Sequence, residues 1–550
     1  MKAPPPPEAI RAALAQAASR LGASDVDVAV ERPRDPTHGD LATNLALTLA
    51  KALGEKPRAI AERLVANIEL PSGLVRKMEI AGPGFINFFL AEAQVVGALP
   101  VILAAGSTYG RSDVGQGRPV NVEFVSANPT GPLHVGHGRQ AALGDAIAAL
   151  LEWTGWRVTR EFYYNDGGGQ IANLARSVQA RIAQLRGRSV EIPEGGYHGE
   201  YIREIAEHYL AAHPNDAGGA DLDAIRRFAV EALRAEQDRD LQAFGVRFDV
   251  YSLESALYTD GKVDETERRL VAAGHTYEKD GARWLRTTDF GDDKDRVMRK
   301  SEAKGGDYTY FVPDVAYHVT KWERGFTRAI NVQGADHHGT VLRVRVGLQA
   351  LEMGIPDGYP EYVLHQMVTV MRGGEEVKIS KRAGSYLTIR DLVDEVGRDA
   401  VRYFFLMRKS DTHFVFDVDL AKSQTEENPV FYVQMAHARM SGIFRVAARD
   451  PESVQAIGAD LSALAQPEEI ELIKTLAEFP ETMQRAAAAL EPNRLTTYLE
   501  GLARVAHAWY HKYRVLGEPE EAARLVLARA VRQVLANGLT LLGIRAPERM

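Results

Sequence analysis

Cysteine is missing from this chain of 550 residues. Its absence excludes disulfide bonds, zinc sites with cysteine ligands and catalysis by a thiol. We accordingly expect no zinc. A chain without cysteine is also compatible with a reducing compartment, so the composition favours a cytoplasmic enzyme.

Long hydrophobic segments are missing as well. No apolar run approaches the about 20 residues that span a membrane. The first ten residues, MKAPPPPEAI, lack the apolar stretch of a signal peptide and are typical of a proline-stiffened N-terminus. We therefore expect no contact with a membrane.

Positive charge is not in excess, because 66 Lys and Arg residues oppose 74 Asp and Glu residues and the net charge is −8. An acidic chain argues against non-specific binding to nucleic acids, although a local basic face can still bind a polyanion. From residue 502 to the end, eight Lys or Arg residues oppose four Glu residues. This basic end is compatible with polyanion binding and equally with a solvated helical surface.

The length requires several domains, since a single hydrophobic core does not grow to this size. Helical apolar spacing near the N-terminus is followed by VRKMEIAGPGFINFFLA, which alternates like two strands around a Gly-Pro-Gly turn. Beyond Asn428 the pattern is almost entirely helical. We predict an N-terminal α+β domain at residues 1–105 and a C-terminal all-α helical bundle at residues 429–550.

The middle of the chain begins with a strand in which Val120, Val122 and Phe124 share one face. A glycine-rich loop, a helix and a second strand follow. This order is the βαβ unit of a parallel sheet, which binds ligands at the carboxyl ends of its strands. We predict a multidomain α/β protein with a Rossmann-type parallel-sheet domain at residues 106–385, an insertion at about 190–290 and a connecting stem at 386–428.

The loop NPTGPLHVGHGRQ, residues 128–140, places two histidines at the start of the predicted helix. A helix N-terminus attracts phosphate groups. Gly136 and Gly138 would let a ligand approach the backbone, and His134 and His137 would add hydrogen-bond donors. An ordinary polar loop is the alternative interpretation.

A second candidate segment is GGEEVKISKRAGSYLTIRDLVDEVG. Lys378, Lys381 and Arg382 place three cations within five residues, which suits a loop that closes over a polyphosphate. The spacing of Thr388 and Asp391 is typical of a capped helix start. A solvated turn is the alternative here.

A metal site is a competing interpretation of the histidines. Asp336, His337 and His338 lie in GADHHG, and together with His134 and His137 they have the chemistry of a divalent-metal site in a metallohydrolase. Metal analysis of the purified protein would distinguish the two readings.

The H-x-G-H motif after the first strand, paired with K-x-S-K far downstream, resembles the signature of class I aminoacyl-tRNA synthetases. Further motifs resemble arginyl-tRNA synthetases from one end of the chain to the other. In chain order they are GPGFINFFL, VEFVSANPTGPLHVGHGR, FYYNDGGGQ, YTYFVPDVAYH, GADHHGTVLR, RDAVRYFFL, ENPVFYVQMAHAR and NGLTLLGIRAPERM.

The resemblance implies an enzyme that uses ATP with Mg²⁺ to convert L-arginine into arginyl-adenylate and then transfers the arginyl group to the 2′-hydroxyl of the terminal adenosine of tRNA(Arg). It implies a requirement for tRNA in the first step. The implied catalytic residues are His134, His137, Lys378 and Lys381. ATP contacts are implied for both histidines and for Gly136, Gly138 and Ser380.

No editing domain is expected, because a site built to hydrogen-bond a guanidinium rejects analogues that lack these donors. The insertion is therefore not expected to edit. The chain departs from the family pattern at Ile379 and Arg382, and both signature lysines remain. A catalytically inactive RNA-binding paralogue is disfavoured by the intact signature residues.

The residue chemistry agrees independently with an arginine substrate. A guanidinium is a permanent planar cation with five donors, so its site needs carboxylates and other acceptors. By resemblance, Tyr310 and Asp314 hold the guanidinium with help from Glu123. Read without the family, Asp314 is also a helix cap, Tyr310 a core aromatic and Glu123 an exposed strand residue.

Three further substrate contacts follow from the resemblance. Asn128 is expected to meet the α-carboxylate or amine of arginine. Asp336 or its neighbour His337 is expected to line the arginine or ATP site, and the motif match does not choose between them. No metal ligand is assigned.

Both ends of the chain resemble tRNA-binding domains. The N-terminal domain resembles the family's module for the tRNA elbow, where Phe85 would stack on a base and Asn87 would bind its edge. The C-terminal domain resembles an anticodon-binding domain, with Tyr510 and Tyr513 as stacking platforms. Core packing is the alternative for these aromatic residues. The family also implies a monomer.

Overall fold

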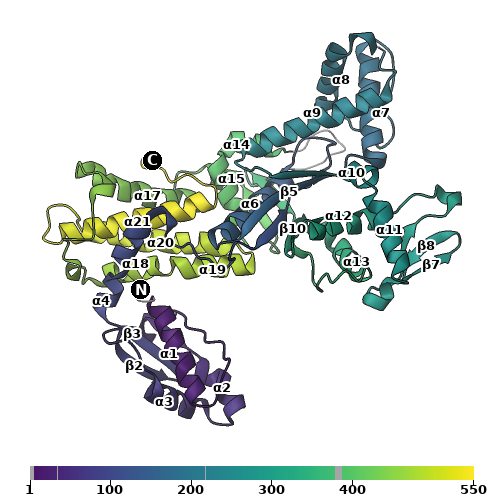
Figure 1. The fold of residues 1–550 in the computed structure, drawn as a ribbon. Coiled ribbons are helices and arrows are strands. Elements are labelled where there is room, and N and C mark those ends of the chain that lie inside the picture. The colour runs from purple at the N-terminus through teal and green to yellow at the C-terminus, as the bar shows by residue number, and fades with distance from the viewer. Residues whose placement is uncertain (1–4, 34, 217, 378–386) are drawn as a thin grey trace.

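The computed structural model describes residues 5–33, 35–216, 218–377 and 387–550. An N-terminal module, a central α/β region with two projecting modules and a helical C-terminal domain are visible in Figure 1. Within the described ranges, no helix combines the length and the apolar composition needed to cross a membrane. The predicted multidomain α/β class is confirmed.

The N-terminal module packs helices on one small antiparallel sheet with strand order β1-β3-β2. Ile10, Leu14 and Ala17 recur at helical spacing and are buried against this sheet, so the predicted α+β domain is observed. Its elements are α1 Pro6–Arg20, β1 Leu41–Thr43, α2 Leu45–Leu53, α3 Pro57–Asn67, β2 Val75–Ala81 and β3 Phe85–Leu90.

The central sheet has five parallel strands in the order β11-β10-β4-β5-β6. The chain winds outward from β4 in one direction and from β10 in the other, so the strand order reverses between them, where open α/β sheets bind ligands. Its strands are β4 Pro119–Glu123, β5 Arg157–Tyr164, β6 Val250–Leu253, β10 Ala329–Gly334 and β11 Glu361–His365, and the flanking helices are α6 Val135–Trp153, α12 Phe311–Glu323 and α13 His338–Gln349.

The segment predicted as an insertion contains strand β6 of the central sheet, so it is not one separate unit. Before β6, three helices form a module with its own apolar core, and after β6 a three-stranded antiparallel sheet forms another. Figure 1 shows both modules projecting from the central region. Their elements are α7 Gly168–Leu185, α8 Glu200–Ala212, α9 Leu222–Ala243, α10 Glu254–Thr259, α11 Lys262–Ala272, β7 Thr276–Lys279, β8 Ala282–Leu285 and β9 Arg296–Arg299.

The C-terminal part begins with a small sheet of order β13-β12-β14 and continues as helices, as predicted. These helices share one continuous apolar core with the central sheet. The elements are β12 Val368–Arg372, β13 Glu375–Glu376, α14 Ile389–Val396, α15 Arg398–Leu406, β14 Phe414–Asp417, α16 Val418–Lys422, α17 Pro429–Val446, α18 Pro467–Ala477, α19 Phe479–Ala489, α20 Asn493–Lys512 and α21 Glu521–Leu541, with α4 Glu92–Val96 and α5 Ala98–Ala105 packed beside α18 and α21.

The N-terminal module is joined to helices α18 and α19 mainly by charged side chains. Its apolar core is separate from the large core, and Leu90 packs against both. The ion pairs of this joint are Arg11–Glu481, Arg32–Glu471, Arg32–Glu478, Lys474–Asp40 and Arg485–Glu31.

Candidate active site

The H-x-G-H turn caps helix α6 with its own histidines. His134 is the N-cap, and its Nδ1 accepts a hydrogen bond from the backbone N–H of Gly136 at 3.1 Å. The backbone N–H of His134 in turn donates to Nδ1 of His137 at 3.3 Å, and the two rings stack with centroids 3.7 Å apart. Because each Nδ1 acts as an acceptor, a neutral ring carries its proton on Nε2, the tautomer that donates from that nitrogen.

The two glycines of the turn make room for protein groups. A Cβ atom at Gly136 would lie 2.9 Å from the His134 ring, so the absence of a side chain lets the ring fold over the helix start. A Cβ atom at Gly138 would lie 3.0 Å from Ile389 and 3.1 Å from Phe405. Gly138 therefore lets α6 approach α14 and α15 closely, and the ATP contacts expected at both glycines stay predictions.

The basic segment, residues 378–386 with Lys378, Ser380 and Lys381, lies outside the described residues, but residues on both sides of it are placed. On the N-terminal side, the Val377 N–H donates to the Val370 carbonyl at 2.8 Å. On the C-terminal side, the helix cap predicted at Thr388 is confirmed, since Thr388 Oγ1 accepts from the Asp391 N–H at 3.0 Å.

The residues that follow the basic segment meet the H-x-G-H turn directly. The N–H of Ile389 donates to the carbonyl of Leu133 at 2.9 Å, and His134 and Thr388 form an isolated antiparallel bridge. Two segments about 250 residues apart in the chain are thus hydrogen-bonded at the carboxyl edge of the sheet.

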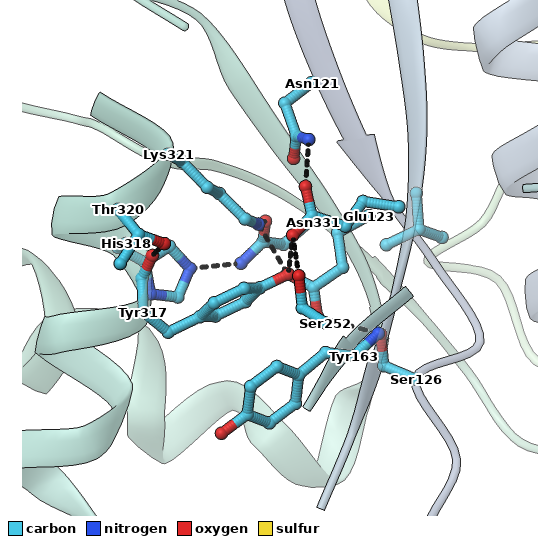
Figure 2. Close-up of polar contacts among 12 residues, drawn as sticks. Asn121, Glu123, Ser126, Tyr163, Ser252, Tyr317, His318, Thr320, Lys321 and Asn331 are labelled. Carbon is cyan, nitrogen blue, oxygen red and sulfur yellow. Dashed lines mark hydrogen bonds and ion pairs between the residues drawn. The ribbon is translucent and has the colours of Figure 1, made fainter. Parts of the chain in front are cut away.

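A buried lysine neutralises Glu123 at the end of β4. Lys321, on α12, is fully buried and donates from Nζ to Glu123 at 2.6 Å and to Asn331 Oδ1 at 3.0 Å. Ser126 Oγ donates to the same carboxylate at 2.9 Å. These side chains converge in Figure 2, so the charge of Glu123 already has a cation inside the protein.

Glu161 on β5 is a second carboxylate with partners of its own. It accepts hydrogen bonds from Asn121, Ser252, Tyr317 and Arg324 at 2.6–3.0 Å. Burial acts to raise the pKa of Glu161, but the nearby cations and these hydrogen bonds outweigh it and hold the pKa below its usual range. Glu161 is therefore ionised and fully compensated.

Asp314 and Glu254 form the other, uncompensated half of the acidic site. Burial, with the neighbouring charges of Glu254 and Glu123, raises the pKa of Asp314 to about 7. Burial, with the nearby Asp166, likewise raises the pKa of Glu254, which accepts a hydrogen bond from the Tyr163 hydroxyl at 3.1 Å. No hydrogen bond to the Asp314 carboxylate occurs within the described part of the chain.

Glu254 is an acidic residue that the sequence analysis missed. It stands directly after β6, at the carboxyl edge of the sheet, and its segment was assigned to the insertion. A four-residue strand followed by a single acid was the available signal. Tyr310, predicted beside Asp314, is 76% exposed at the start of α12, where its ring lies at the protein surface.

The remaining predicted substrate contacts lie along the same edge. Asn128 donates from Nδ2 to Gln170 Oε1 on α7 at 2.8 Å. Asp336 and His337 follow β10, and both side chains are largely exposed. His337 Nε2 lies 3.9 Å from Asp336 Oδ2. Both are close enough to His365, at the end of β11, to affect its pKa, which burial chiefly lowers to about 4.

The metal-site interpretation finds no support in the geometry. In the described ranges, no three His, Asp or Glu side chains form a group able to hold a metal ion.

The four predicted tRNA contacts differ in exposure. Phe85 is 42% exposed at the start of β3, whereas Asn87 is buried. Tyr510 and Tyr513 line a hollow of about 750 Å³ in the C-terminal domain, together with Arg439, Arg514 and the terminal Met550. Three of these four side chains thus reach a surface.

Three family models match this chain. Residues 8–90 match the arginyl tRNA synthetase N terminal domain, and residues 433–550 match the DALR anticodon binding domain. Residues 98–441, more than half of the chain, match the catalytic domain of tRNA synthetases class I (R). The parallel sheet and its H-x-G-H turn are therefore those of a class I aminoacyl-tRNA synthetase, a class of ATP-using ligases.

Similar proteins narrow this class. Arginine–tRNA ligases of Geobacter metallireducens and Thiobacillus denitrificans are 59% and 56% identical over 536 and 553 residues, covering 95% and 98% of each chain. A solved putative arginyl-tRNA synthetase of Campylobacter jejuni is 30% identical, with a TM-score of 0.77 over 84% of this chain and 100% of that one. The arginyl-tRNA synthetase of Thermus thermophilus, 24% identical, shares the fold with a TM-score of 0.77 over 99% of this chain and 100% of its own.

The chain belongs to the arginyl-tRNA synthetase family. It is an arginine–tRNA ligase that joins arginine to tRNA(Arg) for translation, and the function predicted from its motifs is confirmed.

Proposed function

We propose that ATP binds between the H-x-G-H turn and the basic segment. The observation that carries this proposal is the hydrogen bond between Ile389 and Leu133, which joins the exit of the basic segment to the start of α6. His134 and His137 donate to the phosphates at the helix N-terminus, and Lys378 and Lys381 approach from the other side. Gly136, Gly138 and Ser380 complete the ATP site, and Mg²⁺ enters with ATP rather than at a site built by the protein.

The arginine side chain then occupies the uncompensated half of the acidic site. A guanidinium placed between Asp314 and Glu254 would supply the cation that these carboxylates lack, with Tyr310 closing the pocket from its exposed position. Glu123, paired with Lys321, lines the pocket together with Asn128. Asp336 contacts the arginine or the ATP from the end of β10.

Two displacements follow. A carboxylate oxygen of arginine attacks the α-phosphorus of ATP, the bond from this phosphorus to the oxygen bridging to the β-phosphate breaks, and pyrophosphate leaves with the electron pair. The 2′-hydroxyl of the terminal adenosine then attacks the carbonyl carbon, AMP leaves, and the hydroxyl proton passes to solvent. Neither step needs a protein nucleophile, so positioned cations and donors supply the catalysis.

The ends of the chain are proposed to hold the tRNA. The hollow beside Tyr510 and Tyr513 combines aromatic rings with Arg439 and Arg514, which suits a stacked base and its phosphate. Exposed Phe85 offers a second stacking surface, and Asn87 reaches a base edge only after its side chain is uncovered.

The domain boundaries predicted from the sequence are carried over as functional units. Residues 1–105 bind the tRNA elbow, 106–385 catalyse, 386–428 connect and 429–550 bind the anticodon. The separate apolar core, which extends to Leu90, supports an N-terminal unit of its own, whereas Val95, Leu99 and Ile102 belong to the large core. The basic C-terminal end supports tRNA binding there. The enzyme is proposed to act as a cytoplasmic monomer without zinc, which its lack of cysteine supports.

Pyrophosphate exchange with each amino acid, with and without tRNA, tests the site. Arginine alone should support exchange, and only when tRNA is present. Lys381→Ala should lower kcat of exchange by ~10²-fold and leave tRNA affinity nearly unchanged, because the lysine acts in the transition state. Lys279→Ala, at an exposed lysine of the β7–β9 module, is the control, and an unchanged kcat for Lys381→Ala would refute the ATP site.

A further inference from the structure

Helix α9 of the three-helix module reaches the loop that precedes the H-x-G-H turn. Gln237, fully buried on α9, donates from Nε2 to the carbonyl of Gly131 at 2.8 Å and to that of Asn128 at 3.2 Å. On α8, the Tyr201 hydroxyl donates to the carbonyl of Thr130 at 2.8 Å. Three carbonyls of one four-residue stretch are therefore held by side chains from this module.

The loop needs such donors because its own sequence supplies few. Pro129 and Pro132 have no N–H group, so this stretch cannot form the regular ladder of a strand or helix. A buried carbonyl without a donor costs about 1–3 kcal/mol. Gln237 therefore fixes the conformation of the loop immediately before His134.

One turn further along α9, Asp240 holds the exit of the basic segment. Arg390, the second residue of α14, donates from Nε to Asp240 Oδ1 at 2.8 Å, and its Nη2 donates to the same oxygen. Asp240 is nearly buried. Residues three apart lie on one face of a helix, so Gln237 and Asp240 face the two segments from the same side of α9.

Helix α9 is itself held at both ends. Leu233 and residues before it pack in the separate core with α7 and α8. Leu241 and Phe244 belong to the large core, and the Phe244 carbonyl accepts a hydrogen bond from buried Arg402 at 3.2 Å. A single turn of a fixed helix thus contacts both the loop before the H-x-G-H turn and the start of α14.

We propose that α9 is a brace that sets the distance between the H-x-G-H turn and the start of α14, which follows the basic segment in the chain, with Gln237 and the pair Asp240–Arg390 as positioning residues for adenylate formation. This role rests on the ATP site proposed above. ATP must contact both segments at once, and a displacement of about 1 Å in a catalytic group can lower a rate by 10²-fold. The three-helix module would thereby affect catalysis through its hydrogen bonds to these two parts of the chain.

The first test is Gln237→Leu, which keeps the bulk of the side chain and removes both donors. We expect kcat of arginine-dependent exchange, measured with tRNA, to fall about 10²-fold. KM for arginine should change by a smaller factor than kcat, because Asp314 and Glu254 come from α12 and α10 and Gln237 meets Asn128 only at its backbone carbonyl. Ile182→Ala, on α7 in the same core but beside Gly219 ahead of the start of α9, should lower the melting temperature and leave kcat unchanged.

The second test works even if Gln237→Leu does not fold. Asp240→Ala should lower kcat about tenfold or more, and Asp240→Glu, which keeps a carboxylate for Arg390, should restore most of it. Asp240→Ala/Arg390→Ala should be no worse than Asp240→Ala alone, because both substitutions remove the same contact.

The outcomes separate the brace from the ATP site. If Lys381→Ala abolishes exchange while Gln237→Leu and Asp240→Ala keep a wild-type kcat, the brace is wrong and the ATP site stands. If Lys381→Ala is fully active, the ATP site is wrong. A loss of kcat in Ile182→Ala that matches Gln237→Leu at equal melting temperature would show a general loss of structure and would also overturn the brace.

Discussion

The two halves of the acidic site are built differently. In one half, Glu123 and Glu161 lie against Lys321 and Arg324, and their hydrogen bonds are complete. In the other half, Asp314 and Glu254 have no cation partner among the described residues, and burial raises the pKa of each. The difference distinguishes acids that maintain the structure from acids that recognise a cationic substrate, although all four are the same kind of group at the same edge of the sheet.

The compensated half should show the largest effect on stability. Lys321→Met removes a buried cation and leaves Glu123 unpaired, so the free energy of unfolding should fall by ~3–5 kcal/mol. Denaturant unfolding measures this loss. Lys262→Met, at a half-exposed lysine paired with Glu323, is the matched control and should cost ~0–1 kcal/mol.

A second substitution sharpens this result. Lys321→Met/Glu123→Gln removes both members of the pair and should recover much of the stability, since the unpaired charge is gone. If Lys321→Met unfolds at the same denaturant concentration as the wild type, Glu123 is not compensated by this lysine and the two halves do not differ.

A substitution in the uncompensated half should lower activity and leave stability unchanged or slightly raised. Asp314→Asn keeps the volume and removes the charge that meets the guanidinium, at a cost of ~2–5 kcal/mol, or about thirty-fold to several-thousand-fold in kcat/KM. Most of this loss should lie in KM for arginine, because the guanidinium is remote from the reacting carboxylate. Arginine kinetics and thermal melting on the same variant provide the measurement.

Stability separates the two possible roles of Asp314. A desolvated carboxylate without a partner does not stabilise the fold, so Asp314→Asn should melt at or slightly above the wild-type temperature. A lower melting temperature with an unchanged KM would make Asp314 a structural cap and would move the substrate pocket elsewhere.

The raised pKa of Asp314 predicts a pH dependence of arginine binding. Its pKa of about 7 in the free enzyme means that the carboxyl is protonated below that pH, and a bound guanidinium requires the ionised form. KM for arginine should therefore rise about tenfold per pH unit below 7 and level off above it. Asp314→Asn should lose this dependence, and a wild-type KM that is flat from pH 5 to 8 would contradict it.

The raised pKa of Asp314 also makes the free energy of unfolding depend on pH. The sign is opposite to that of a carboxylate in an ordinary ion pair, whose pKa is lowered. Between the usual pKa of 3.8 and about 7, the folded chain keeps a proton on Asp314 that the unfolded chain has released. The contribution of Asp314 to stability therefore falls as pH rises through this window. Asp314→Asn should remove that contribution to the pH profile of unfolding.

The smallest effect is expected at Ser126. Its hydroxyl donates to Glu123 at 2.9 Å and accepts from the Tyr163 N–H at 3.1 Å, so it links the compensated carboxylate to the neighbouring strand. Ser126→Ala should cost ~0.5–1.5 kcal/mol of unfolding free energy, because Lys321 still neutralises Glu123. A loss as large as that of Lys321→Met would show that the hydroxyl, and not the lysine, maintains this half.

Much of the fold and part of the site could be predicted from the sequence, because their signals are local. Alternating Val120, Val122 and Phe124 followed by a glycine-rich turn predicted the strand, the loop and the helix of the βαβ unit, all of which are observed. The helix cap at Thr388 was equally local.

What the sequence did not predict depends on contacts between distant residues. The local sequence does not distinguish Lys321 from an exposed lysine on a helix. Only the fold places it against Glu123, 198 positions away. Strand β6 has four residues within a charged region, which is too short for a clear alternation, and Glu254 was overlooked with it. No local sequence pattern indicates Gln237 and Asp240, because their hydrogen-bond partners lie in distant segments of the chain.

The joint of the N-terminal module has a consequence for how such a protein can be assembled over evolutionary time. The module has a core of its own and meets α18 and α19 through ion pairs such as Arg32–Glu478. A unit of this kind can be acquired, lost or exchanged by gene fusion while its host goes on folding. The C-terminal helices share their core with the catalytic sheet and have no such independence; they could only be inherited together with it.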